Sequence, residues 1–243
     1  MFDRPKYKRF AKAQLKGRYS VPIFMTLVMA GVSLLYYIPL AIRFVNSGII
    51  GMAMNGDVAA TESAANQLML TSMQTSSTVM STVYSIILQI MTVAALNVYL
   101  KMTRTPEKVS FSNFIEGFNN WGRAVLGAIW QMLWVFLWSM LFFIPGIIKQ
   151  ISYSQMFFLI AEYDGISVNK AMRISMEITR GHKWELFVME LSFIGWYFLN
   201  SLTFGILSLF IMPYRTLSFA NAYHDMLKEA VESGRITVED LAQ

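Results

Sequence analysis

The sequence predicts an all-α fold, in the form of a polytopic helical membrane protein. Apolar residues make up 55% of the 243 residues and charged residues only 14%, which is too little charge to cover a soluble domain of this length. Several apolar runs reach about 20 residues, the length that a helix needs to cross the hydrocarbon core. We predict six transmembrane helices in three hairpins, each hairpin preceded by an interfacial amphipathic helix.

The composition also narrows the classes of partner and cofactor. The chain has no cysteine, which excludes disulfides and thiolate metal sites. Its formal net charge of +5 comes from basic residues at the ends of the apolar runs rather than on one face, so no nucleic-acid partner is predicted. The sequence contains no glycine-rich phosphate loop, His-Glu-x-x-His motif or serine nucleophile motif. We therefore expect no cofactor, no metal and no enzymatic activity.

A basic amphipathic segment, residues 5–18, begins the chain. Its mostly apolar face lies opposite several lysines and consists of Tyr7, Phe10, Ala11, Gln14, Leu15 and Arg18. Such a helix is expected to lie on an anionic leaflet. The apolar run that follows, residues 19–42, is too long for the core of a signal peptide and is predicted to be an uncleaved first span.

The next segment is predicted to be external and to lead into a polar span. Residues 44–77 contain no Lys or Arg and are rich in small and polar residues, and residues 61–77 can extend the second span outward as a helix. The second span, residues 78–100, carries several hydroxyl and amide side chains. These side chains suit hydrogen bonds between packed helices, and a pore wall is the alternative interpretation.

A short interfacial helix and a tryptophan-rich span come next. Ser110 can cap a helix whose phenylalanines recur at helical spacing, and Trp121 is expected to anchor the chain at the interface. The third span is predicted over residues 125–144. Its tryptophans recur every four residues, which is typical of a lipid-facing or packing surface: Trp130, Trp134 and Trp138.

The fourth span is short and depends on a charge argument. Pro145 and Gly146 predict a tight turn, and residues 147–161 follow it. On length alone this segment can be re-entrant. The next connection is basic, however, and basic connections lie on the cytoplasmic side, so the segment is counted as a span.

The last third of the chain repeats the pattern of an amphipathic helix followed by a hairpin. Ser167 can cap a helix that ends at Gly181, and the last two spans are predicted over residues 186–202 and 204–223, joined by a minimal turn around residues 201–203. The remaining residues, 224–243, are predicted to be a cytoplasmic tail. Residues 1–223 then form a single membrane domain.

The distribution of charge supports this topology. Of the 20 Lys and Arg, all but Arg43, Lys149 and Arg215 fall in segments predicted to be cytoplasmic, so both termini are expected in the cytoplasm. The three hairpins and their amphipathic helices also resemble one another. This similarity indicates either an internal repeat or the shared requirements of a helix that enters a membrane.

Charged residues within the predicted spans are the main candidate sites. Glu190 lies about 9 Å into the fifth span and Arg215 about 12 Å from the same face in the sixth, so the two can pair. The pair would either lock the hairpin or bind an anion or proton. Lys149 is placed near the external face, where it can extend to the interface or, with Ser152 and Gln155, bind an anionic headgroup or solute.

Three residues at the start of the fifth span, His182, Lys183 and Trp184, are expected to be interfacial anchors. Neither His182 nor His224 has the spacing of a metal site. A lipid enzyme would need acids and histidines around one cleft, and Glu185 with these two histidines are the only residues that could supply them.

The second half of the chain contains several short sequence motifs that resemble those of a known family. The motifs that carry the resemblance are Ile144-Pro145-Gly146-Ile147-Ile148-Lys149, Ser152-Tyr153-Ser154, Ile160-Ala161, Gly181-His182-Lys183, Leu191-Ser192-Phe193-Ile194-Gly195-Trp196 and Pro213-Tyr214. They resemble the bacterial integral membrane family known as domain of unknown function 975, as does Leu15-Lys16-Gly17. The Glu162-Tyr163-Asp164-Gly165 corner departs from that family, which more often has Asp first and Pro near the turn. The resemblance implies a multi-pass protein of the bacterial cytoplasmic membrane and adds no activity.

Two functions are compatible with these features. The first is a non-enzymatic protein that organises or senses the membrane through contacts with lipids, including anionic headgroups at the cytoplasmic face, as a possible homo-oligomer. The second is a small transporter or channel for an ion, a lipid or a small anionic solute, which would use the intramembrane charges and the polar second span.

Overall fold

The structure is a computed structural model that describes residues 2–75 and 78–241, without the side chains of residues 71–79. All regular elements of these residues are helices, as the sequence predicts. Three of the helices are long and apolar enough to cross a membrane. They correspond to the first three predicted spans: α2 (Ser20–Asn46), α5 (Thr78–Arg104) and α7 (Trp121–Leu141), the last continuous with α6 (Phe111–Glu116) and η1 (Gly117–Asn120).

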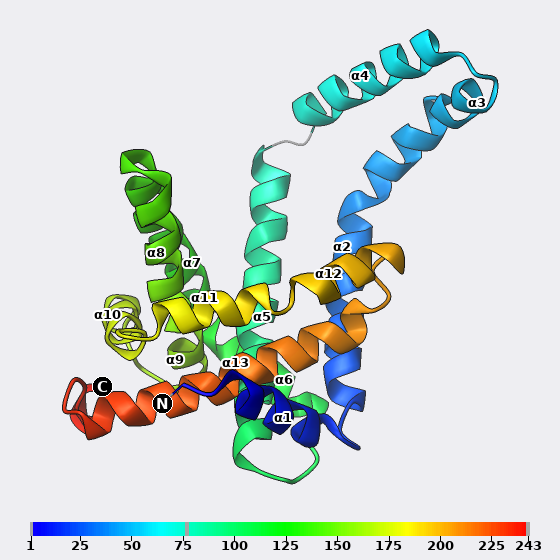
Figure 1. Cartoon of the computed structure of the whole chain (residues 1–243). Coiled ribbons are helices and arrows are strands. Elements are labelled where there is room, and N and C mark those ends of the chain that lie inside the picture. Colours follow the sequence, from blue (N-terminus) through cyan, green and yellow to red (C-terminus); the bar gives the residue numbers. More distant parts are fainter. Residues whose placement is uncertain (1, 76–77, 242–243) are drawn as a thin grey trace. The chain divides into compact units, whose positions relative to one another are not determined.

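The chain divides into two units, Met1–Leu27 with Gln89–Gln243 and Val28–Leu88. The smaller unit contains two further helices, α3 (Ile49–Met54) and α4 (Val58–Thr75), which pack together (Figure 1). The segment predicted as a polar connection is therefore largely helical, because alanines and other good helix formers outweigh its few glycines. The helix predicted over 61–77 is confirmed as far as Thr75; residues 76–77 lie outside the described residues.

The first hairpin of the larger unit is α7 with α8 (Phe143–Tyr153). The chain reverses at Phe142, whose backbone is extended, with φ −158° and ψ 146°. The turn predicted at Pro145-Gly146 is thus wrong: Pro145 lies in the first turn of α8, where a missing N–H costs no hydrogen bond. Gly146 instead allows α7 and α8 to approach each other closely, because a Cβ there would lie 3.1 Å from the Cα of Ser139 on α7.

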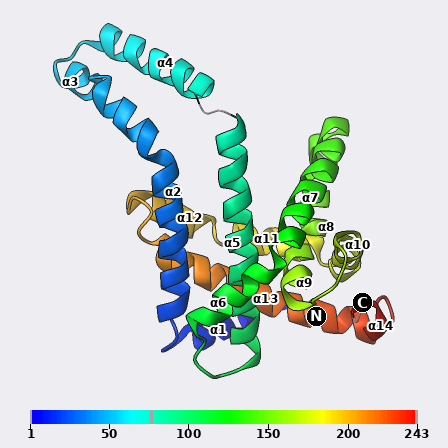
Figure 2. The ribbon, with the colours of Figure 1, turned by 180° about the vertical axis from the view of Figure 1, so that it is seen from behind.

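The fourth and fifth predicted spans are each divided into two helices. The fourth becomes α8 and α9 (Met156–Glu162), and the fifth becomes α11 (Lys183–Leu191) and α12 (Ile194–Leu202). At 1.5 Å per residue none of these pieces reaches the roughly 30 Å of a hydrocarbon core alone. Within this unit, α11, α12 and α13 (Ser208–Glu232) run across α7 and α8 rather than along them (Figures 1 and 2). The three long apolar helices are confirmed among the described residues, and the arrangement of six spans stays a prediction.

The end of the chain also differs from the prediction. The turn before α13 lies further along than residues 201–203, with positive φ at Phe204 and Gly205. No helix begins at His224, because α13 continues without a break to Glu232. A last short helix, α14 (Val238–Leu241), follows the reciprocal hydrogen bonds between Thr237 and Asp240 that their spacing predicts.

The first helix, α1 (Arg4–Leu15), packs on α13 rather than presenting a free apolar face. Its buried side chains are Tyr7, Ala11 and Leu15. Lys6 pairs with Asp225 at 2.8 Å, and the amides of Gln14 and Asn221 exchange two hydrogen bonds, of 3.1 and 2.8 Å. Most of the face of α1 that was predicted to lie on lipid therefore packs against protein, and the prediction of an interfacial helix is corrected for that part of the face.

The other two amphipathic helices begin where their capping residues predict. Ser110 and Asn113 form a capping box at the start of α6. The Ser167 side chain accepts a hydrogen bond from the N–H of Lys170 at the start of α10 (Val168–Ile178). The apolar side of α10 is buried by α7, α8, α9 and α13, so it too faces protein rather than lipid.

Candidate functional site

The structure joins Glu190 of α11 and Arg215 of α13 in a bidentate ion pair, as their predicted depths suggest. The Nε of Arg215 donates to both carboxylate oxygens at 3.1 Å, and its Nη2 donates to Oε2 at 2.7 Å. The Tyr197 hydroxyl donates to Oε1 at 3.4 Å, and the guanidinium lies 4.8 Å from the ring centroid of Phe219. The side chains are 33% (Arg215) and 41% (Glu190) exposed, so the pair lies at the surface of the protein.

Lys149 and Lys183 lie on helices that pack together, α8 and α11. The Nζ of Lys149 is 4.6 Å from the ring centroid of Trp138. Burial lowers the pKa of Lys183, with a smaller contribution from the positive charge of Lys149. The sequence places one lysine near the external face and the other at the cytoplasmic face, about 30 Å apart.

Ser152 and Gln155 lie at the break between α8 and α9, and both are buried. The Ser175 hydroxyl of α10 bridges this break: it donates to the Ser152 carbonyl at 2.7 Å and accepts from the Gln155 N–H at 3.2 Å. The Gln155 Nε2 donates to the Ser154 hydroxyl, whereas its Oε1 is buried without a hydrogen-bond partner in the described part of the chain. These residues and Lys149 are therefore held by different partners.

The predicted anchors divide into exposed and bonded side chains. Trp121 and Trp184 are 61% and 71% exposed, as interfacial anchors require. The ring of His182 instead lies against protein: its Nε2 is 3.0 Å from Oε1 of Glu229, and Phe2 stacks on it. This contact lowers the pKa of the Glu229 carboxyl.

The sequence interpretation missed a buried polar cluster between α5, α9 and α13. The carboxylate of Glu162 is 3% exposed and contacts both Arg104 and the hydroxyl of Tyr223. Beside this cluster, His224 Nε2 of α13 lies 2.8 Å from the hydroxyl of Thr103 on α5. One sequence signal could have indicated this cluster. Glu162 is an acid at the end of an apolar helix, and a carboxylate that is buried there requires a partner.

His224 is expected to make the protein sensitive to acid. The Thr103 hydroxyl donates to the Leu100 carbonyl, so it accepts from His224 Nε2–H, which fits a neutral ring. Burial, with the charge of Arg104, lowers the pKa of His224 to about 4. The pKa of His224 is thus lower in the folded protein than in the unfolded chain. The stability that the neutral ring contributes is fully present above about pH 6.5 and is lost as the pH falls toward 4. We expect a loss of about 3 kcal/mol over that range.

Chemical denaturation of the detergent-solubilised protein at a series of pH values measures this loss. His224→Gln should flatten the dependence, and His182→Gln, the matched control, should retain it. An unchanged pH profile in His224→Gln would contradict the assignment.

The two histidines named above for a lipid enzyme lie in different places in the described part of the chain. His182 bonds Glu229 and His224 bonds Thr103, so the two histidines belong to different clusters. No group of three His, Cys, Asp or Glu that could hold a metal occurs among residues 2–75 and 78–241.

All regular elements of the described residues are helices, and three of them are long and apolar enough to cross a membrane, which indicates a helical protein of membrane type. Comparison with known families then gives a more specific result. The family model described as protein of unknown function (DUF975) matches residues 1–230, and the chain belongs to this family. No curated protein and no solved structure matches it.

Proposed function

We propose that the protein is a non-enzymatic, multi-pass protein of the bacterial cytoplasmic membrane that organises the lipid around it, with both termini in the cytoplasm. The observation that carries this proposal is the apolar surface of α7, which remains exposed along its whole length. Its exposed side chains, between 36% and 75%, are Leu126, Ile129, Met132, Leu133, Trp134, Phe136, Leu137, Met140 and Leu141. A surface of this extent suits lipid as its solvent.

The proposed topology keeps the cytoplasmic termini and replaces straight spans by broken ones. α2, α5 and α7 cross the membrane, and α8 with α9 returns the chain to the cytoplasmic side. α11, α12 and α13 run across α7 and α8 (Figures 1 and 2), so we place them along the cytoplasmic side of the membrane, where the chain ends on the side from which it begins. The basic residues of the connections support this orientation, and the hydroxyl of Ser175 satisfies backbone groups at the α8–α9 break, as broken helices within a membrane require.

The natural absence of cysteine makes this topology directly testable by single-cysteine labelling. Asn55→Cys and Phe142→Cys should react with a membrane-impermeant maleimide in intact spheroplasts. Glu107→Cys and Ser233→Cys should react only after the membrane is permeabilised, which is each variant's own control. Equal labelling of Ser233→Cys in intact and permeabilised cells would reject a cytoplasmic C-terminus, and labelling of all four positions from one side would reject a membrane-crossing protein.

Transport of a small solute is the second candidate function. The observation that favours it is the α8–α9 break, because transporters commonly form their sites at discontinuous helices and none of the described residues bonds the Gln155 Oε1 there. The same labelling series separates the two candidates. Gln155→Cys should resist a small water-soluble thiol reagent if the break is a sealed packing position, and it should react if the break lines a solute pathway.

A further inference from the structure

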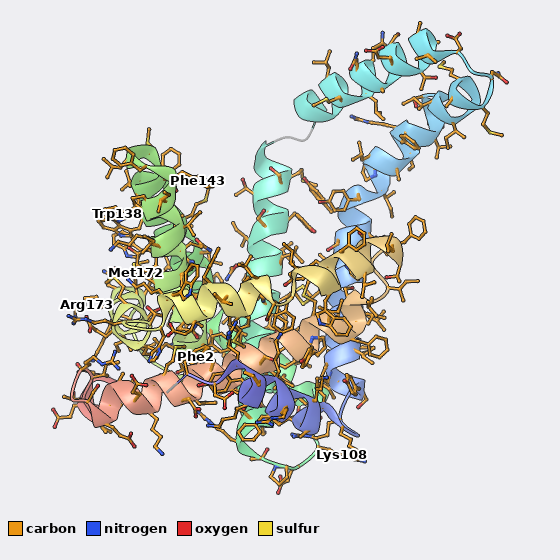
Figure 3. The ribbon with its side chains drawn as sticks, in the orientation of Figure 1. Phe2, Lys108, Trp138, Phe143, Met172 and Arg173 are labelled. Atoms are coloured by element: carbon orange, nitrogen blue, oxygen red, sulfur yellow. The ribbon has the colours of Figure 1, made fainter. Side chains whose placement is uncertain are left out.

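The hairpin formed by α12 and the start of α13 has a large apolar surface that no described part of the chain covers. α12, all of whose residues the structure describes, has no buried residue, and its side chains extend from the ribbon on several sides (Figure 3). A helix that is apolar all round is stable only when protein or lipid surrounds it. The apolar side chains of α12, of the connection and of the first turn of α13 that are between 41% and 98% exposed are Ile194, Trp196, Phe198, Leu199, Leu202, Phe204, Ile206 and Phe210.

This hairpin carries no charge between its two ends. Residues 191–214 contain no Asp, Glu, Lys, Arg or His. The residues that flank this segment, Glu190 and Arg215, form the bidentate ion pair described above, so the charges at its two ends neutralise each other. An uncharged segment of this kind can enter an apolar medium without the cost of burying an unpaired charge.

The turn at the tip of the hairpin satisfies its own backbone. Each N–H from Thr203 to Ser208 donates a hydrogen bond within residues 200–208, that of Leu207 to the Thr203 hydroxyl and the others to carbonyl oxygens. The hydroxyls of Ser201, Thr203 and Ser208 also donate to carbonyl oxygens of the hairpin. In water a turn can leave such groups to the solvent, whereas in lipid the protein itself must pair them. The tip therefore meets the requirement for a turn in lipid.

Cations and aromatic rings lie at the base of the hairpin. Lys8 of α1 donates to Ser192 Oγ at 2.6 Å, at the break between α11 and α12, and its Nζ lies 4.3 Å from the ring centroid of Phe193. The Nζ of Lys12 lies 5.6 Å from the ring centroid of Tyr214. Lysines beside aromatic rings are typical of the headgroup level, and α1 lies on the cytoplasmic side in the proposed topology. The base of the hairpin thus fits the cytoplasmic headgroups and the tip fits the acyl chains.

We propose that residues 194–212 insert into the cytoplasmic leaflet alone, with Phe204 among the acyl chains of that leaflet. The nine residues of α12 extend about 14 Å, half of the roughly 30 Å of a hydrocarbon core. The proposal rests on the proposed function, since it requires a membrane around α7. A second copy of the chain would cover one side of α12, whereas lipid covers every side, so the acyl chains are the favoured partner of this surface.

Single-cysteine fluorescence in vesicles of phosphatidylethanolamine and phosphatidylglycerol tests the proposal, because the chain has no cysteine of its own. Phe204→Cys is labelled with the fluorophore NBD and should be quenched by lipids that carry a nitroxide on the acyl chain. Quenching by aqueous iodide should be about fivefold weaker than in the control, because ions are excluded from hydrocarbon. The matched control is Val238→Cys, at an apolar residue of α14 that is 69% exposed, which iodide should quench and nitroxide lipids should not.

A second measurement locates the leaflet. In intact spheroplasts, Phe204→Cys should not react with a membrane-impermeant maleimide, because the tip does not reach the external face. Reaction there would show that the hairpin crosses the whole membrane, as two complete spans require, and would overturn the proposal.

The other results also distinguish the alternatives. Iodide quenching equal to that of Val238→Cys would place the hairpin in water, and protection from both quenchers would place it against protein; either result overturns the proposal. Phe204 is 98% exposed, so its replacement should leave folding intact, and Leu202→Cys offers a second position with the same expected results. If these tests fail while the four topology variants react from both sides of the membrane, the insertion is rejected and the proposed function stands.

Discussion

Replacing Gly117 by alanine is expected to destabilise the protein by about 3 kcal/mol or more. A Cβ at this position would lie 2.6 Å from both the Cα and the carbonyl oxygen of Ala94. These are backbone atoms of α5, so no side-chain rotation can relieve the overlap. The only remedy is to separate η1 from α5, which opens a contact between two buried residues. Thermal unfolding in detergent, followed by circular dichroism, measures the effect.

Gly122→Ala is the matched control for this substitution. Gly122 is also a helical glycine, five residues along the chain, but a Cβ there meets no heavy atom within 4 Å. Alanine has the higher helix propensity, so this variant should be unchanged or more stable by up to about 1 kcal/mol. If Gly117→Ala unfolded at the same temperature as the unaltered protein, the close approach of η1 to α5 would be incorrect.

Removing one partner of the Glu190–Arg215 pair is also expected to destabilise the protein. Glu190→Gln leaves the guanidinium of Arg215 beside Phe219 without its charged partner, and it weakens three hydrogen bonds. We expect a loss of about 2 kcal/mol, less than for a fully buried pair because both side chains are partly exposed. The same unfolding measurement applies.

The double variant Glu190→Leu with Arg215→Leu distinguishes a structural pair from a binding site. It leaves no unpaired charge, so stability should recover to nearly that of the unaltered protein. If the pair only locks α11 to α13, retention of phosphatidylglycerol should also be unchanged. Recovered stability with lost lipid binding would show that the pair belongs to a ligand site, and an unrecovered stability would contradict the lock.

Local sequence signals predicted those features that depend on neighbouring residues. Ser110, Ser167 and Thr237 begin helices as expected, because a capping side chain bonds backbone groups only two or three residues away. The long helices α2 and α5 follow from uninterrupted apolar runs. The Glu190–Arg215 pair was also predictable, because a short connection between two helices places residues of similar depth opposite each other.

Features that depend on distant contacts were not predictable in this way. Gly146 suits both a turn and a close helix contact, and only the position of Ser139 distinguishes them. The breaks at residues 154–155 and 192–193 contain no proline. The hydroxyl of Ser175 on a separate helix compensates the first of them. The contacts of Glu162 with Arg104 and Tyr223 likewise join residues far apart in the chain.

By itself, the sequence determined the all-helical class, the family and the first three long apolar helices, because apolar length and charge asymmetry are summed over neighbouring residues. Only the tertiary structure decided what each amphipathic face contacts. An apolar helix face can be covered equally well by lipid or by another helix. The apolar faces of α1 and α10 are covered by protein. The tertiary structure also brought Glu162 together with Arg104 and Tyr223, since the charge of a residue does not reveal which other group lies beside it.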